Sequence, residues 1–159
     1  MPINDESAKQ SAEEYLATKL EEERQAYEHQ LNMETAFARS PLVWKSVKDT
    51  IIAKCAQWNE VTQEETLTCK ETLLGDIRIW CAARAKQMTV QFDSKRLLIT
   101  VKNAARLENE TDVVMRIQGY WTGTERDTRL IHSEQVVNID LLILSELRVL
   151  AGMSRQRIA

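Results

Sequence analysis

The stretch that decides the fold is MTVQFDSKRLLITV, residues 88–101. On both sides of the turn-forming residues Asp93 to Lys95, apolar side chains alternate with others. The alternating apolar positions are Met88, Val90, Phe92, Leu97, Ile99 and Val101. A period of two places these side chains on one face of a pleated backbone. The stretch therefore predicts a β-hairpin with one apolar face and one mostly polar face.

A second hairpin is predicted further along the chain, with strands at residues 113–121 and 129–137. The glycine-containing segment 122–128 supplies the turn between them. In the first of these strands, one alternating set is expected to face the core: Val113, Met115, Ile117, Gly119 and Trp121. Because Gly119 has no side chain, it marks either a bulge or the close approach of another segment.

Residues 72–87 fit two patterns. Ile77, Ile79 and Cys81 alternate as in a strand, but a second set falls at helical spacing: Leu73, Ile77, Trp80, Arg84 and Met88. We choose the strand, because a turn at Gly75-Asp76 precedes it and the first hairpin follows it. Residues 66–137 are then one antiparallel meander of about five strands.

Residues 1–39 are predicted to form a long acidic helical arm that starts near residues 4 to 11. Its apolar residues recur at steps of four or seven: Ala8, Ala12, Leu16, Leu20, Tyr27, Leu31 and Ala38. Such spacing draws one narrow apolar stripe on a charged helix. The acidic residues 21–23 leave a full turn without an apolar side chain, so we expect the arm to be partly exposed.

Ser40-Pro41 predicts a boundary between two helices, because the residue before a proline disfavours the helical region and Pro41 suits a first helical position. A core helix over residues 40–59 follows, and Asn59 is expected to end it. Its buried face is predicted from steps of three and four: Trp44, Val47, Ile51, Cys55 and Trp58.

A last amphipathic helix is predicted over residues 138–152, capped by Asn138 and stopped by Gly152, with a tail at residues 153–159. The whole order predicts a single domain, residues 1–159, of the α+β class. It comprises two N-terminal helices, an antiparallel meander of about five strands, and a C-terminal helix packed on one face of the sheet. The other face is left to solvent or to a partner.

Charge is distributed unevenly over the 159 residues, whose formal net charge is −3. Residues 1–39 carry 4 basic and 9 acidic side chains, whereas residues 80–159 carry 12 basic and 9 acidic ones. Because acids are interleaved with the cations, we expect no nucleic-acid binding. The longest apolar run is four residues, and the N-terminus is acidic, so we expect no membrane association and a cytoplasmic location.

No catalytic, metal-binding or phosphate-binding motif stands out. The three cysteines, Cys55, Cys69 and Cys81, have spacings of 14 and 12 and are expected to be reduced thiols, two of them in the core. Neither histidine, His29 or His132, lies in a recognisable motif. We therefore predict no cofactor, no metal and no catalytic residue, and the sequence leans against an enzyme without deciding the point.

Five residues are candidates for a pocket or a contact surface. They are Trp80, Arg116, Tyr120, Trp121 and His132. If Trp80 points opposite Ile77 and Ile79, it suggests a second apolar surface on the outside of the sheet.

Two hypotheses of function remain open. The first is a non-catalytic protein–protein interaction or adaptor domain that self-associates as a homodimer. Its contact surfaces would be the long acidic helix, residues 5–39, and the outer face of the sheet. The alternative is a small-molecule binding or catalytic domain with a pocket between sheet and helices. That pocket would be lined by Trp44, Trp58, Met115 and Trp121 and polarised by His132 or Arg116.

Overall fold

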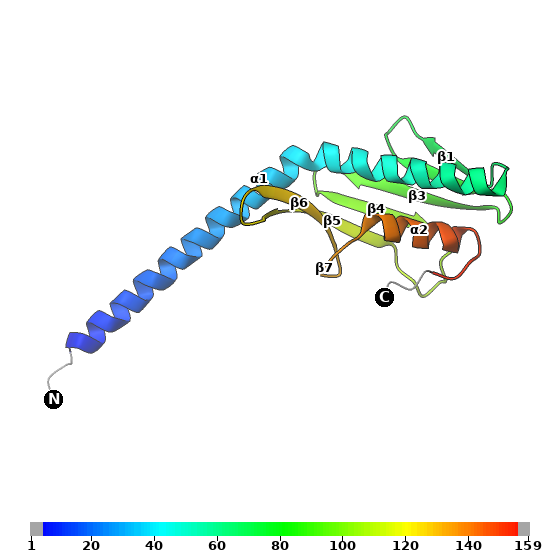
Figure 1. The fold of residues 1–159 in the computed structure, drawn as a ribbon. Helices are drawn as coiled ribbons and strands as arrows, with labels where there is room; N and C mark the ends of the chain where they lie inside the picture. The colour runs from blue at the N-terminus through cyan, green and yellow to red at the C-terminus, as the bar shows by residue number, and fades with distance from the viewer. Residues whose placement is uncertain (1–4, 156–159) are drawn as a thin grey trace.

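The computed structural model describes residues 5–155, and it confirms an α+β fold with an antiparallel sheet between an N-terminal and a C-terminal helix (Figure 1). The elements are α1 Asp5–Thr62, β1 Leu67–Glu71, β2 Ile77–Cys81, β3 Lys86–Asp93, β4 Leu98–Asn103, β5 Val113–Trp121, β6 Arg126–His132, β7 Gln135–Val136 and α2 Ile139–Leu150. The expected helix start at residue 4 and the end of the expected tail, 156–159, lie outside the described residues.

The sheet has seven strands rather than about five, in the order β1-β2-β3-β4-β5-β6-β7. Every neighbouring pair is antiparallel, as a meander requires. One additional strand arises because Ser133 and Glu134 both have positive φ and split the predicted strand 129–137 with a tight turn. At the other edge, all five residues of β1 pair with β2 although their alternation is weak.

The choice of a strand for residues 72–87 is confirmed by β2. Ile77, Ile79 and Cys81 are buried, and Arg78 and Trp80 between them are exposed. The helix-favouring alanines that follow lie in the turn to β3. Burial on one face therefore outweighs the local helix propensity.

The predicted boundary at Ser40-Pro41 is wrong, because α1 runs through Pro41 as one helix of 58 residues and ends at Thr62 rather than Asn59. A proline inside a helix leaves the carbonyl four residues earlier without its backbone donor. Here that carbonyl belongs to Phe37, and the Ser40 hydroxyl donates to it at 3.1 Å. Ser40 is thus buried as a substitute donor rather than serving as a cap. In Figure 1 the axis of α1 changes direction between its projecting half and the half on the sheet.

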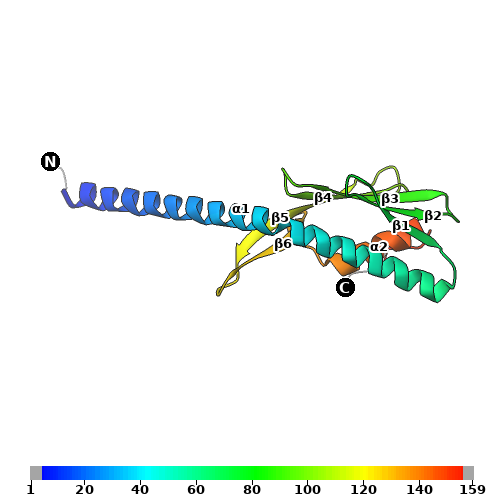
Figure 2. The same cartoon turned by 90° about the horizontal axis from the view of Figure 1, so that it is seen from above.

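Both helices cover the same face of the sheet, which we call the inner face, and Figure 2 shows them together on one side of it. The helical part of the core is Ala36, Trp44, Val47, Ile51 and Cys55 of α1 with Ile143, Leu147 and Leu150 of α2. Trp44 stacks on Phe92 of β3 with ring centroids 5.6 Å apart. The predicted core face of residues 40–59 is thus confirmed, with Trp58 only partly buried at its margin.

Gly119 marks a close approach, one of its two predicted meanings. A Cβ placed on Gly119 would lie 2.1 Å from the backbone oxygen of Asn32 in α1. The missing side chain therefore lets α1 cross β5 at backbone distance. By contrast, Trp121 does not face the core as expected but is 54% exposed. The pairing of β4 with β5 ends at Arg116, so position 121 lies beyond the part of β5 that β4 flanks.

A buried polar cluster holds α2 against the connection between β4 and β5. Glu146 is 1% exposed and lies 2.9 Å from Arg106 Nη2 and 2.7 Å from Arg155 Nη1. Asn103 donates to Glu146 through its side-chain amide at 3.0 Å. Two cations and an amide thus satisfy a carboxylate that would otherwise be costly to bury.

Between residues 5 and 155, neither helix combines the length and the apolar character that a membrane span requires.

Candidate functional site

The first candidate surface is the N-terminal end of α1, residues 5–27, which we call the arm. Every residue from Ser7 to Tyr27 is exposed. At 1.5 Å per residue, 23 helical residues extend for ~35 Å, and Figures 1 and 2 show this segment projecting beyond the sheet. The exposed large apolar side chains of the arm are Tyr15 (71%), Leu16 (55%), Leu20 (57%) and Tyr27 (60%).

The apolar stripe on α1 follows a repeat of eleven residues. Leu16, Leu20, Tyr27, Leu31, Ala38 and Leu42 are separated by steps of four, seven, four, seven and four. Eleven residues make about three helical turns, so these positions stay on one side of the helix. The stripe continues onto the body with Leu42, which is 70% exposed, whereas Trp44 on the core side is 8% exposed. The stripe is therefore a different face of α1 from the one that packs on the sheet.

The arm is strongly acidic. Residues 5–27 hold seven acidic and three basic side chains, a formal net charge of −4. Arg24 pairs with Glu21 at 2.6 Å, and its hydrogen bonds lower the pKa of that carboxyl. Among the described residues, this is the one ion pair within the arm, so most of its carboxylates face solvent without a cation.

The base of the arm is fixed to the end of the β5–β6 hairpin. Arg126 of β6 donates to Asn32 at 2.6 Å and pairs with Glu28 at 2.9 Å. Arg39, about two turns of helix after Asn32, pairs with Asp127 at 3.1 Å. Glu28 is the first side chain of α1 that pairs with the body in the described part of the chain. The direction of the arm is therefore set by contacts at its base.

The second candidate surface is the outer face of the sheet, the face that neither helix covers. Its central residues alternate with the core positions and are Thr68, Lys70, Arg78, Trp80, Gln87, Thr89, Gln91, Thr100, Lys102, Val114, Arg116, Gln118, Arg129 and Ile131. Five of them are cations and none is acidic. At strand ends of the same face, Asp93 and Asp127 each lie within 4.0 Å of an arginine.

Three of these cations form one row across four strands, which we call the cation row. Lys70 of β1 is the direct cross-strand partner of Arg78 of β2, Arg78 is the partner of Thr89, and Thr89 is the partner of Lys102 of β4. In the described part of the chain, no carboxylate lies within 4.0 Å of any of the three. The sequence analysis did not predict this row. Alternation with buried positions indicates that each of the three cations faces outward, but only the pairing of the strands shows that they lie in one row.

Three of the five predicted site residues lie on the outer face, namely Trp80, Arg116 and, near the end of β5, Tyr120. Trp80 is 42% exposed and points away from the core, as expected if it forms a second apolar surface. It lies beside the cation row, opposite Thr68 in the register. Arg116 is exposed on β5 and belongs to the same face, but several strands away from Trp80.

Tyr120, Trp121 and His132 lie at the β5–β6 side of the sheet. Tyr120 is covered by the Arg129 guanidinium, 4.3 Å from its ring centroid, and Trp121 lies under Arg126 at 5.6 Å. The Nδ1 atom of His132 lies 2.9 Å from the Val114 carbonyl oxygen. The structure therefore spreads the five residues over the sheet instead of bringing them together in one pocket.

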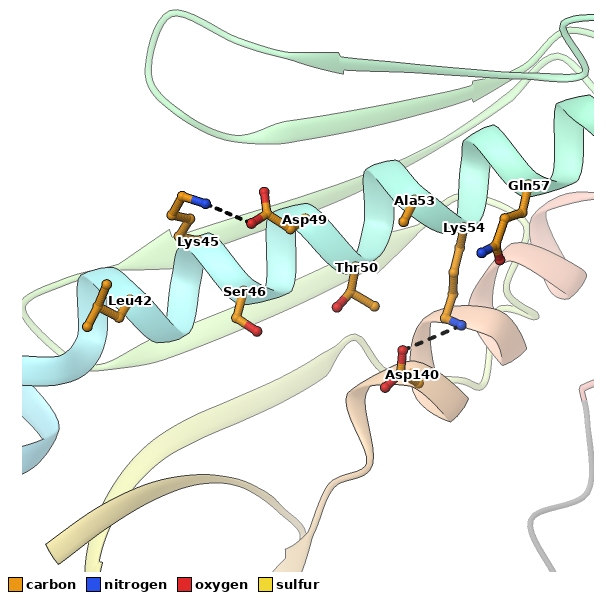
Figure 3. A pocket seen from close by; sticks show the side chains of 9 residues that line it. All are labelled: Leu42, Lys45, Ser46, Asp49, Thr50, Ala53, Lys54, Gln57 and Asp140. Carbon is orange, nitrogen blue, oxygen red and sulfur yellow. Dashed lines mark hydrogen bonds and ion pairs between the residues drawn. The ribbon is translucent and has the colours of Figure 1, made fainter.

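The layer between sheet and helices is occupied by packed side chains where the second hypothesis places a pocket. Trp44 and Met115 are both in the core cluster, with 8% and 0% exposure. Surface hollows occur elsewhere. One of about 470 Å³ lies along the solvent side of α1, where Figure 3 shows Lys45 paired with Asp49 at 2.8 Å and Lys54 paired with Asp140 at 3.5 Å. Its lining has no cysteine or histidine that could serve as nucleophile or base.

Metal binding finds no support in the described residues, in which no group of three or more His, Cys, Asp or Glu side chains is placed to hold an ion. Comparisons with protein-family models, with curated proteins and with solved structures found no match.

Proposed function

We propose that the protein is a non-catalytic association domain that binds other proteins, first of all a second copy of itself, through the arm. The observation that carries the proposal is the exposed stripe on α1. A helix that projects from its domain gains no tertiary packing, and helices of this length are only marginally stable in water unless an apolar face is covered. Covering Leu16, Leu20 and Tyr27 with a second chain would remove that apolar surface from solvent.

The proposal includes a cytoplasmic location. Cys55, Cys69 and Cys81 are unpaired thiols, as in proteins of reducing compartments.

Sedimentation equilibrium of the full chain over a range of concentrations tests self-association. We expect a reversible equilibrium that the double variant Leu16→Gln/Leu20→Gln weakens about tenfold or more. Burying a leucine side chain contributes ~1.5–3 kcal/mol, and a factor of ten needs only ~1.4 kcal/mol. Glutamine is close to leucine in helix propensity, so the arm should stay helical.

A matched control is Ser11→Gln/Thr18→Gln. These two positions also lie on the exposed arm, but on the side of α1 opposite the stripe. We expect this variant to associate as the wild type does. A wild-type chain that stays monomeric near 1 mM, or equal loss in both variants, would rule out the stripe as an interface.

A second candidate function, small-molecule binding, is favoured by one hollow of about 540 Å³ beside α1, β6 and the residues that lead into α2. Its walls are largely apolar, with Val43, Val47, Leu130, Val137 and Ile139 among them, and Arg39 and Asp127 lie at its edge. That composition is typical of ligand sites. A thermal-shift screen of small metabolites tests it, and a hit that Val43→Trp abolishes would support it.

A further inference from the structure

We propose that the arm of one chain docks on the outer face of the sheet of a second chain, with its acidic side chains over the cation row. This inference rests on the proposed self-association and names the surface that the arm uses. The occupant is a second copy of this chain, because the arm and the outer face are complementary in charge, in apolar character and in spacing.

The cation row is the reason why the outer face calls for an acidic partner. Like charges on directly opposed strand residues destabilise a sheet, and Lys70 stands directly opposite Arg78. Lys102 extends the row, and no described carboxylate lies within 4.0 Å of the three cations. A partner that brings carboxylates to this row would relieve their mutual repulsion.

The side of the arm that carries the stripe also carries carboxylates. Glu13 precedes Leu16 by three residues, and Glu23 lies between Leu20 and Tyr27 at a further step of three and four. The five side chains therefore occupy one helix face. Glu23 takes the place where the stripe would otherwise have an apolar residue.

The spacing of these carboxylates matches the spacing of the cations. Ten residues separate Glu13 from Glu23, a rise of ~15 Å along the helix. Three strand spacings separate Lys70 on β1 from Lys102 on β4, which is ~14 Å. An arm lying across the strands can therefore place Glu13 and Glu23 over the two ends of the cation row. Leu16 and Leu20 then lie between them, where the exposed indole of Trp80 offers an apolar contact.

The arm cannot reach the outer face of its own sheet, because α1 packs on the inner face and the arm continues away from the sheet (Figures 1 and 2). Pairing of two arms along their stripes is less favourable. It would bring two segments of charge −4 together and place Glu23 of each in the contact. Each chain has one arm and one outer face, so reciprocal exchange would close a two-chain assembly.

A charge-reversal experiment tests the contact. Lys70→Glu/Lys102→Glu reverses the ends of the cation row, and Glu13→Lys/Glu23→Lys reverses the matching carboxylates of the arm. We expect each variant alone to self-associate about tenfold or more weakly than the wild type. We expect an equimolar mixture of the two to associate with a dissociation constant close to that of the wild type, because both contacts in the mixed pair again join opposite charges.

Lys45→Glu/Lys95→Glu is the matched control for the sheet variant, since it makes the same change in net charge outside the cation row. We expect it to self-associate more tightly than Lys70→Glu/Lys102→Glu. Circular dichroism and thermal unfolding check that each variant is folded. If Lys70→Glu/Lys102→Glu associates as tightly as the wild type, or if the mixture shows no recovery, docking on the outer face is refuted. Should Leu16→Gln/Leu20→Gln still weaken association in that case, the proposed self-association stands and only its surface is wrong.

The salt dependence of the wild-type chain provides a second, independent measurement. Docking of the acidic arm on the cation row predicts a dissociation constant that rises severalfold between about 0.05 M and 0.5 M NaCl, because salt screens the attraction. Pairing of two acidic arms predicts a fall, because salt screens their repulsion. A constant or falling value would overturn the inference without any variant.

Discussion

A single hydroxyl allows α1 to continue through a proline. Pro41 has no amide proton for the Phe37 carbonyl, and the Ser40 hydroxyl donates to that carbonyl instead, at 3.1 Å. We expect Ser40→Ala to lower the free energy of unfolding by about 1 kcal/mol, the usual contribution of such a hydrogen bond. Urea denaturation of the two proteins measures this difference.

Pro41→Ala provides the control for this prediction, because an alanine at position 41 restores the backbone donor. In the Pro41→Ala background, Ser40→Ala should lower the free energy of unfolding clearly less than it does beside proline. Equal costs in the two backgrounds would show that the hydroxyl has another role.

The thiols of Cys55 and Cys69 differ in their predicted reactivity. A hydrogen bond to Cys69 and burial in the core raise the pKa of the Cys55 thiol far above its ordinary value. Cys69 is only half-buried, and its pKa is lowered by the same hydrogen bond. Since the thiolate is the reactive form, we expect iodoacetamide to modify Cys69 well before Cys55 in the folded chain between pH 7 and 9. Mass spectrometry of tryptic peptides measures both rates, and faster labelling of Cys55 would contradict the assignment.

Repulsion between Lys70 of the edge strand β1 and Arg78 of β2 is expected to lower the free energy of unfolding. Replacing Lys70 by glutamate would place opposite charges directly across from each other at Lys70 and Arg78. We expect Lys70→Glu to raise the free energy of unfolding of the monomer by about 0.2–1 kcal/mol. Thermal or urea unfolding in dilute solution measures it, and Lys70→Gln should give a smaller gain. A lower stability for Lys70→Glu would mean that the two cations are not in repulsion.

At the scale of single elements, alternation was the signal that could be read from the sequence. It predicted β3, β4 and β5 and the identity of β2, because one face of each strand is buried. The unity of α1 could not be predicted in this way. A Ser-Pro pair can start a helix, and it can also lie inside a helix when the serine hydroxyl replaces the missing backbone donor. Packing of both Ala36 and Trp44 on the same sheet favours the continuous helix.

The candidate surfaces were predictable only in part, for a similar reason. The exposed stripe of the arm follows from spacing within one helix, and the outward direction of Trp80 follows from alternation within one strand. The cation row depends on which residues of β1, β2 and β4 stand opposite one another. That register is set by turns and pairing over some 35 residues, which no local pattern contains.

For the whole molecule, the structure predicts that the body does not need the arm in order to fold. The core begins at Ala36, and the pairing of α1 with the body begins at Glu28. We expect deletion of residues 1–27 to leave the free energy of unfolding within about 0.5 kcal/mol of the wild type, when both are measured as monomers. The truncated chain should also remain monomeric at concentrations where the wild type associates. A large loss of stability would show that the arm contributes to the fold of its own chain.

Because α1 is continuous from the arm to the core, the rotation of the stripe about the helix axis is fixed relative to the sheet. Each residue inserted between positions 28 and 36 would turn the stripe by about 100° about the helix axis relative to the sheet and advance it by about 1.5 Å. Eleven inserted residues would nearly restore the original orientation at greater reach. Evolution can thus lengthen the arm by eleven residues at a time and keep the stripe on the same side. Insertion or deletion of a single residue would turn the stripe toward another side.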